Sequence, residues 1–146
     1  MMTRKIVFVL AIACFSFGLN ACKSRSNSNQ AQIATADNSQ TGIDWNGTYS
    51  GILPAADCEG IETKISLNAD NTYQISWKYI GKDDKVYTNE GTFTWDAAGS
   101  IITLKNMDAT KEPTMYKVCE NHLLQLDLKG EVITGEFADN YVLNKD

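Results

Sequence analysis

Apolar and polar residues alternate with a period of two along most of the chain after residue 43. The stretch IETKISLN has Ile61, Ile65 and Leu67 on one face, and TYQISWKYI repeats the pattern from Tyr73 to Tyr79. This alternation is typical of half-buried antiparallel strands. Other stretches of the same character are WNGTYSGIL, KVYTNEGTF, GTFTW, SIITLK, TMYKVCE, HLLQLDL and FADNYVLN. The pattern predicts eight or nine short strands.

Short polar segments separate these strands, and no longer segment has a helical stripe. The predicted turns are Ala69-Asp70-Asn71, residues 96–100, Glu120-Asn121 and Lys129-Gly130. Asn, Asp and Gly tolerate the positive φ that tight hairpins require. Short connections favour pairing of consecutive strands, and closure of such a sheet removes its exposed edges. We therefore predict an all-β, antiparallel up-and-down barrel, with a flattened sandwich as the alternative.

The interior of an eight-stranded barrel is either filled by side chains or holds one small ligand. Bulky residues are frequent at the predicted inward positions, which favours a filled core. The alternative is an aromatic-lined pocket in the barrel mouth, for which the candidate residues are Tyr73, Trp77 and Trp95.

The first 21 residues have the pattern of a secretory signal. Arg4 and Lys5 precede an uncharged run over residues 6–17, which is too short to span a bilayer as a helix. The following LNAC resembles a bacterial lipobox, in which Cys22 would be acylated and become the new N-terminus. Ordinary signal cleavage, with Cys22 an incidental thiol, is the alternative. A doubly or triply acylated cysteine anchors a protein stably to a membrane.

Residues 22–43 are rich in Ser, Asn, Gln, Ala and Thr, with little apolar surface to bury. Such a segment is expected to be a disordered, flexible tether between the lipid and a single domain over residues 44–146. Lys23 follows the predicted acylated cysteine where an Asp would favour retention in the inner membrane. The sequence thus favours an outer-membrane lipoprotein of a Gram-negative bacterium, facing the periplasm.

The charge of the chain argues against nucleic-acid binding. Its net charge is −5, and without Arg4 and Lys5 the chain has eleven basic and eighteen acidic residues. No basic patch appears on a predicted strand, so phosphate backbones are not expected partners. No nucleophile–base pair, zinc motif or phosphate-binding glycine loop is present, so we expect a protein without enzymatic activity. We expect a monomer.

The stretch WNGTYSGILPAADCEGIETKISLNADNTY resembles the start of the N-terminal domain of the NlpE copper-resistance lipoproteins. YIGKDD, GTFTWD and YKVCENHLLQLDLKGEVITGEFADNYVLNK continue the resemblance to about residue 145. It implies a lipocalin-like barrel on the periplasmic side of the outer membrane. It also implies a role in copper tolerance and in signalling envelope or surface stress to a periplasmic sensor-kinase domain.

The chain departs from the family pattern in two respects. The longer members of the family have a second, C-terminal domain, whereas the resemblance here covers the first domain alone. The C-x-x-C of the family is interrupted, because Ala55 stands where its first cysteine is expected, three residues before Cys58. A lone thiol in this loop cannot form the local disulfide or the two-sulfur metal site of a C-x-x-C.

Cys119 is the other thiol after Cys22, and the strand count places it at the end of the barrel opposite Cys58. A strand spans ~20 Å, whereas a disulfide requires Cα atoms within ~7 Å. We therefore predict no Cys58–Cys119 bond with eight strands; a ninth strand would reverse this expectation.

Cys58 remains a candidate ligand for Cu(I), with Met107 and Met115 as possible soft partners. Its acidic neighbours and the lone His122 are more typical of a solvated surface. Three functions compete: a lipid-tethered interaction module, a lipocalin-like carrier of a small apolar ligand, and direct Cu(I) binding by Cys58. The sequence predicts no other cofactor.

Overall fold

The computed structural model describes residues 38–146. The predicted signal peptide, the acylation site Cys22 and most of the predicted tether lie outside the described residues. Within the described part of the chain, no helix is both long enough and apolar enough to cross a membrane.

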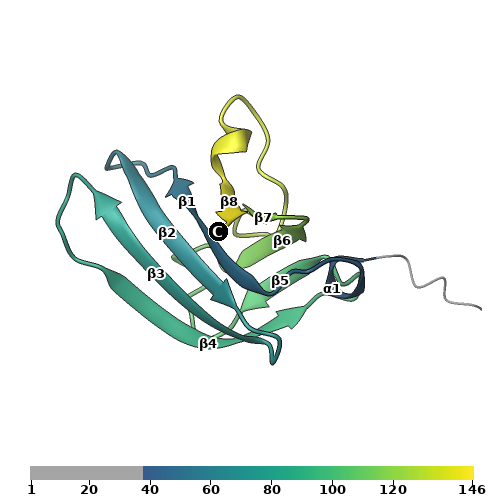
Figure 1. The fold of residues 1–146 in the computed structure, drawn as a ribbon. Helices are drawn as coiled ribbons and strands as arrows, with labels where there is room; N and C mark the ends of the chain where they lie inside the picture. The colour runs from purple at the N-terminus through teal and green to yellow at the C-terminus, as the bar shows by residue number, and fades with distance from the viewer. Residues whose placement is uncertain (1–37) are drawn as a thin grey trace, which may run out of the picture. The chain divides into compact units, whose positions relative to one another are not determined.

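Eight antiparallel strands form a closed barrel in which each strand pairs with its neighbours in sequence (Figure 1). The barrel closes through hydrogen bonding of the first strand to the last, where Tyr49 lies opposite Lys145. The strands are β1 (Gly47–Leu53), β2 (Gly60–Leu67), β3 (Thr72–Ile80), β4 (Tyr87–Trp95), β5 (Ile101–Leu104), β6 (Met115–Cys119), β7 (His122–Gln125) and β8 (Val142–Lys145). The predicted up-and-down barrel is confirmed, and the sandwich alternative is wrong.

The count is eight because KVYTNEGTF and GTFTW belong to one strand. β4 runs without a break from Tyr87 to Trp95 and pairs with β3 over six residue positions. Gly91 lies at its middle, where an added Cβ would stand 3.1 Å from the Tyr73 ring. Glycine there lets the strand pass close to a buried ring without a turn.

Asparagine provides the left-handed backbone in three connections, at Asn71, Asn106 and Asn121, with φ of 63°, 67° and 63°. Asn71 ends the β2–β3 turn and Asn121 ends the β6–β7 turn, as the turn residues predicted. Asn tolerates this conformation better than other residues with a Cβ. These turns hold the register that points the alternating apolar residues inward.

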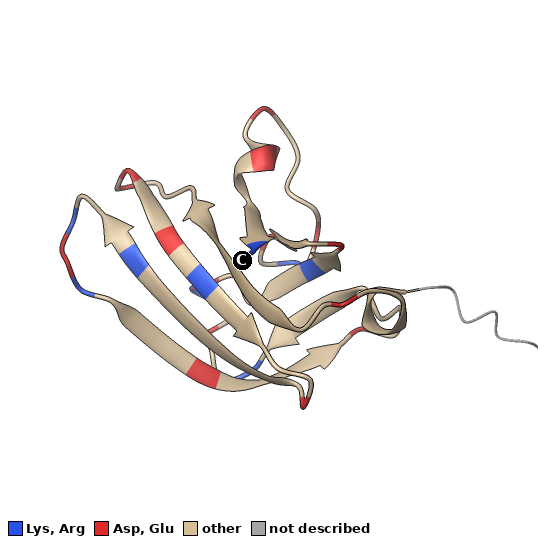
Figure 2. Ribbon diagram, in the orientation of Figure 1, with Lys and Arg blue, Asp and Glu red and all other residues tan. Residues whose placement is uncertain are grey.

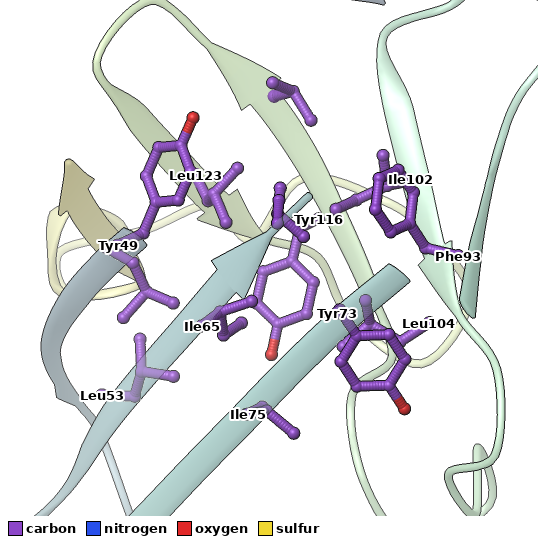
Figure 3. Packing of buried hydrophobic residues seen from close by; sticks show 13 residues of the cluster. Tyr49, Leu53, Ile65, Tyr73, Ile75, Phe93, Ile102, Leu104, Tyr116 and Leu123 are labelled. Atoms are coloured by element: carbon purple, nitrogen blue, oxygen red, sulfur yellow. The ribbon is translucent and has the colours of Figure 1, made fainter. Parts of the chain in front are cut away.

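The core consists of the inward residues of all eight strands (Figure 3). Tyr49, Ile65, Ile102, Leu123 and Leu143 are inaccessible to solvent. Two buried tyrosine hydroxyls have backbone partners, because a polar group buried without a partner is costly. Tyr49 Oη donates to the Trp45 carbonyl at 2.5 Å, and Tyr73 Oη donates to the Lys105 carbonyl.

One end of the barrel, called the closed end below, is covered by the short helix α1 (Ser39–Gly42). The Asn38 side chain caps this helix, and Ser39 Oγ donates to the Val118 carbonyl at 2.6 Å. The Gln40 amide donates to the Gly99 carbonyl at 2.9 Å. Residues 39 and 40 of the predicted linker thus hydrogen-bond to the barrel, at the end of β6 and at the β4–β5 turn.

Three aromatic residues pack beneath α1. The Trp45 ring meets Phe93 and Trp95 edge-to-face at centroid distances of 5.8 and 5.3 Å. Edge-to-face contacts of this kind add to the free energy gained from burial. Trp95 Nε1 is buried without a hydrogen-bond partner among the described residues. Contacts among these three aromatic rings, together with α1, thus cover the closed end of the barrel.

Candidate functional site

The other end of the barrel, called the mouth below, is bordered by four loops. An up-and-down topology alternates connections between two ends, so the loops at residues 54–59, 81–86, 105–114 and 126–141 share the end opposite α1 (Figure 1). The last of these contains the 3-10 helix η1 (Ala138–Asn140). These loops are longer than the connections at the closed end.

A cavity of about 190 Å³ lies at the mouth. Strands β1, β2 and β3 contribute apolar walls that include Leu53, Ile61 and Ile75, and the loop at residues 105–114 contributes Met107 and Pro113. The sequence favours a filled core, and the buried cluster from all eight strands occupies the barrel beside this cavity.

Four aromatic side chains and one carboxylate give the cavity its chemical character. The aromatic residues are Trp77, Tyr79, Tyr116 and Tyr141, and among the described residues lining the cavity Glu112 alone is charged. Nothing in the periodicity singled out Glu112, because it lies in a loop that packs back over the mouth. The lining is thus apolar and aromatic, with one acidic group.

Burial raises the pKa of the Tyr116 phenol, against the opposing effect of a hydrogen bond from Gln125, and the charge of Glu112 raises it further. Burial is also the main cause of the raised pKa of Tyr73, and Glu112 again contributes. Both tyrosines therefore remain neutral at physiological pH.

The structure does not bring together the three aromatic residues predicted to line a pocket. Trp77 borders the cavity. Trp95 packs against Trp45 at the closed end, and Tyr73 is buried in the core with its hydroxyl bound to the Lys105 carbonyl. All three point inward, but β3 and β4 span the whole barrel, so residues on one face can lie at different depths.

An aromatic cluster continues from Trp77 along the rim of the mouth. Trp77 stacks on Tyr87 at 5.8 Å, and Tyr79 meets Tyr87 edge-to-face at 5.7 Å. Two lysines approach this cluster: Lys85 Nζ lies 4.5 Å from the Tyr87 centroid, and Lys82 Nζ lies 5.5 Å from that of Tyr79. Ammonium groups thus lie over aromatic faces at this rim.

Cys58 and Cys119 are both free thiols. Cys58 lies in the β1–β2 loop at the mouth, where its Sγ is 3.2 Å from the Gly60 carbonyl oxygen. Cys119 ends β6 at the closed end, opposite His122 of β7. The topology therefore separates the two cysteines, as the eight-strand count predicted.

The described residues contain no group of three or more His, Cys, Asp or Glu side chains arranged to hold a metal ion. Met107 lines the mouth cavity, whereas the Met115 sulfur packs against Gly130. His122 Nδ1 lies 3.1 Å from the Glu120 carbonyl oxygen, at the closed end. The structure thus assembles no multi-residue site around Cys58 from these side chains.

The surface of the mouth is acidic and partly apolar. Its four loops carry ten carboxylates and five lysines, several of which are visible in Figure 2. The large exposed hydrophobic residues of the domain all lie in these loops or at the adjoining end of β1; they are Ile52, Val86, Leu128, Val132 and Phe137. The period-two pattern does not single out these exposed residues.

Comparison with known proteins identifies relatives of the barrel. The model of the NlpE N-terminal domain family matches residues 49–136. The chain is 29% identical to Lipoprotein NlpE of Escherichia coli over 143 residues, which are 98% of this chain and 57% of that protein. It is 30% identical to the 17 kDa lipoprotein of Treponema pallidum over 109 residues, covering 68% of this chain and 69% of the relative.

Solved structures include a lipoprotein of Shewanella oneidensis with a TM-score of 0.68 and 44% identity, covering 75% of this chain and 96% of that one. A crystal structure of E. coli NlpE, described there as the Cpx pathway activator, matches at a TM-score of 0.49 and 31% identity, over 62% of this chain and 47% of that one. The chain spans little more than half the length of the E. coli protein.

Proposed function

We propose, because this chain belongs to the NlpE N-terminal domain family, that it is a lipid-anchored module that reports envelope stress to a protein partner. The stress includes copper and surface contact, and the partner is a periplasmic sensor-kinase domain. The module has no enzymatic activity of its own. The relatives that carry the proposal are named lipoproteins, and one of them is described as an activator of the Cpx pathway.

The anchor of this module is the acylated Cys22. The alignment with E. coli Lipoprotein NlpE extends over 98% of the chain and therefore includes the lipobox-like LNAC. Two or more acyl chains on one residue give stable membrane attachment. Lys23 after the cysteine favours the outer membrane, with the barrel in the periplasm.

The mouth is the surface that meets the partner, and the exposed apolar residues of its loops are the observation that carries this proposal. Phe137 is 65% exposed and Val86 57% exposed, and both lie in loops of the mouth. The described residues begin at the closed end, at the opposite end of the barrel from the mouth. The excess of carboxylates in these loops fits a partner with a basic contact surface.

Deletion of the gene in its own host tests the signalling role. We expect weaker induction of the envelope-stress response by copper and by surface contact, and restoration of induction by the wild-type chain. A Cys22→Ser chain should not restore it. Normal induction in the deletion strain would refute the proposed function.

A second candidate is a carrier of a small apolar ligand, and the mouth cavity is the observation that favours it. Clefts of this kind, mainly apolar with a few polar groups, are the usual form of small-molecule sites. Binding of apolar probes should shift the NMR signals of Trp77. If no probe perturbs these signals, the cavity is not a ligand site.

Direct copper binding depends on Cys58, a single thiol in an exposed loop. One soft ligand is a weak basis for Cu(I) affinity, so we propose that copper tolerance arises through signalling. Calorimetric titration with Cu(I) decides the matter. Equal heats for wild type and Cys58→Ala would exclude the thiol as a ligand, whereas a heat lost in the variant would establish it.

A further inference from the structure

The size of the mouth cavity limits what it can hold. Its volume of about 190 Å³ is somewhat larger than the ~150 Å³ of an engineered apolar cavity that binds benzene. The cavity therefore has room for a body of about one aromatic ring and a short polar group. A long acyl chain or a polycyclic molecule would extend into solvent.

The charge of the cavity selects among molecules of this size. Glu112 is half-buried, and within residues 38–146 no lysine forms a salt bridge with it. Its neighbour Lys111 instead pairs with Asp108, at 2.9 Å. A carboxylate beside an apolar cavity, without a cationic partner, favours a ligand that brings a positive charge.

The aromatic lining favours the same kind of ligand. The faces of Trp and Tyr rings attract cations, most strongly where water is excluded. Trp77, Tyr79, Tyr116 and Tyr141 border the cavity. At the rim, Lys85 and Lys82 already lie over tyrosine rings. The ten carboxylates of the surrounding loops also raise the local concentration of cations relative to anions.

We propose that the mouth cavity binds a small organic cation with an apolar body of about one ring. The ammonium group lies against the Glu112 carboxylate, and the ring lies among Trp77, Ile75 and Tyr116. This inference rests on the ligand-carrier candidate above and names the class of ligand. It is independent of the signalling role.

Three probes of similar size, each with one aromatic ring, separate the effect of charge from that of shape: benzylammonium, benzyl alcohol and benzoate. Dissociation constants come from NMR titration of the ¹⁵N-labelled chain from Lys23 onward, in low salt. This fragment is suitable because the barrel closes through its own strands and the crystallised Shewanella chain is almost wholly this domain. We expect benzylammonium to bind about fivefold more tightly than benzyl alcohol, and benzoate to bind most weakly.

Glu112→Gln should remove the preference for benzylammonium and leave the affinity for benzyl alcohol unchanged. Glu62→Gln is the matched control, because Glu62 is an exposed residue on the outer face of β2 and its substitution changes the net charge equally. Equal affinities for the cation and the alcohol, or a preference that persists in Glu112→Gln, would overturn the cation site alone. If none of the three probes shifts the cavity signals, the ligand-carrier candidate fails with it.

Discussion

At the closed end of the barrel Trp45, Phe93 and Trp95 pack edge-to-face beneath α1, whereas at the mouth Trp77 and Tyr79 border a cavity. The same strands supply aromatic residues to both ends. The closed end has short turns and a helix hydrogen-bonded across it, and the mouth has long loops with exposed apolar residues. Packing is closer at the end covered by α1 than at the mouth, which is why we assign stability to the closed end and propose binding at the mouth.

The sharpest test of this contrast is to remove one aromatic ring at each end. Phe93→Ala should lower the free energy of unfolding by about 3–5 kcal/mol, because Phe93 is 2% exposed and holds Trp45 and Trp95. Trp77→Ala should cost less than ~2 kcal/mol, because its ring is only partly buried beside a cavity. Urea denaturation monitored by circular dichroism measures both. A larger loss for Trp77→Ala would contradict the contrast.

High pH should weaken the closed end through Tyr49. Burial, with a smaller effect of Asp44, raises the pKa of this phenol to about 12, against about 10 in the unfolded chain. The folded state thus favours the protonated form, so its contribution to stability is complete below pH 10 and is lost as pH rises through 12. Ionisation of this residue should cost roughly 2 kcal/mol.

Urea midpoints between pH 9 and 12 measure this loss. The urea midpoint of Tyr49→Phe should fall less steeply over this pH interval than that of wild type. It should start lower at pH 9, because the variant lacks the hydrogen bond to the Trp45 carbonyl. Identical slopes would show that Tyr49 does not titrate as proposed.

A substitution in a turn at the closed end should have a smaller effect on the stability of the domain. Asn71→Ala should destabilise the domain by about 1 kcal/mol, because φ is 63° at this position and a Cβ without a polar side chain is strained there. Asn71→Gly is the control and should cost much less, since glycine adopts this conformation freely. Thermal unfolding of the two variants distinguishes backbone strain from a lost side-chain contact.

Loss of an exposed ion pair at the mouth should have the smallest effect on the stability of the domain. Asp57 pairs with Lys82, and both groups are exposed. Asp57→Asn should therefore leave the unfolding transition unchanged at physiological salt, because exposed pairs contribute little. A clear drop in the urea midpoint would mean that the loop at residues 54–59 holds the mouth in shape.

The barrel can be predicted from the sequence because strand positions and tight turns are both marked by short stretches of the chain. Alternation such as that of IETKISLN sets which face is buried, and asparagines such as Asn71 and Asn121 mark the tight turns. The exception is KVYTNEGTFTW, which contains Gly91 and reads as one strand or two. Only the packing of the Tyr73 ring against Gly91 shows why the strand continues.

The site is much less predictable, because the mouth is formed by loops without periodicity. Inward orientation alone could not separate Trp77 from Trp95, which lie at opposite ends. Glu112 and Phe137 carry no signal in the sequence, since their positions depend on how the loops at residues 105–114 and 126–141 fold over the barrel. The short helix α1 could not be predicted because its hydrogen bonds are made to residues distant in the sequence, Gly99 of the β4–β5 turn and Val118 of β6.

Paired substitutions at the two ends, assayed in cells with an envelope-stress reporter, test most directly whether the mouth is the functional end. Val86→Glu combined with Phe137→Glu adds charge to two exposed apolar positions in the loops of the mouth, and Ala97→Glu adds charge to an exposed turn at the closed end. At equal protein levels we expect the mouth variant to lose induction of the reporter by copper and the Ala97→Glu variant to match wild type. Full induction by the mouth variant, or loss confined to Ala97→Glu, would contradict the account.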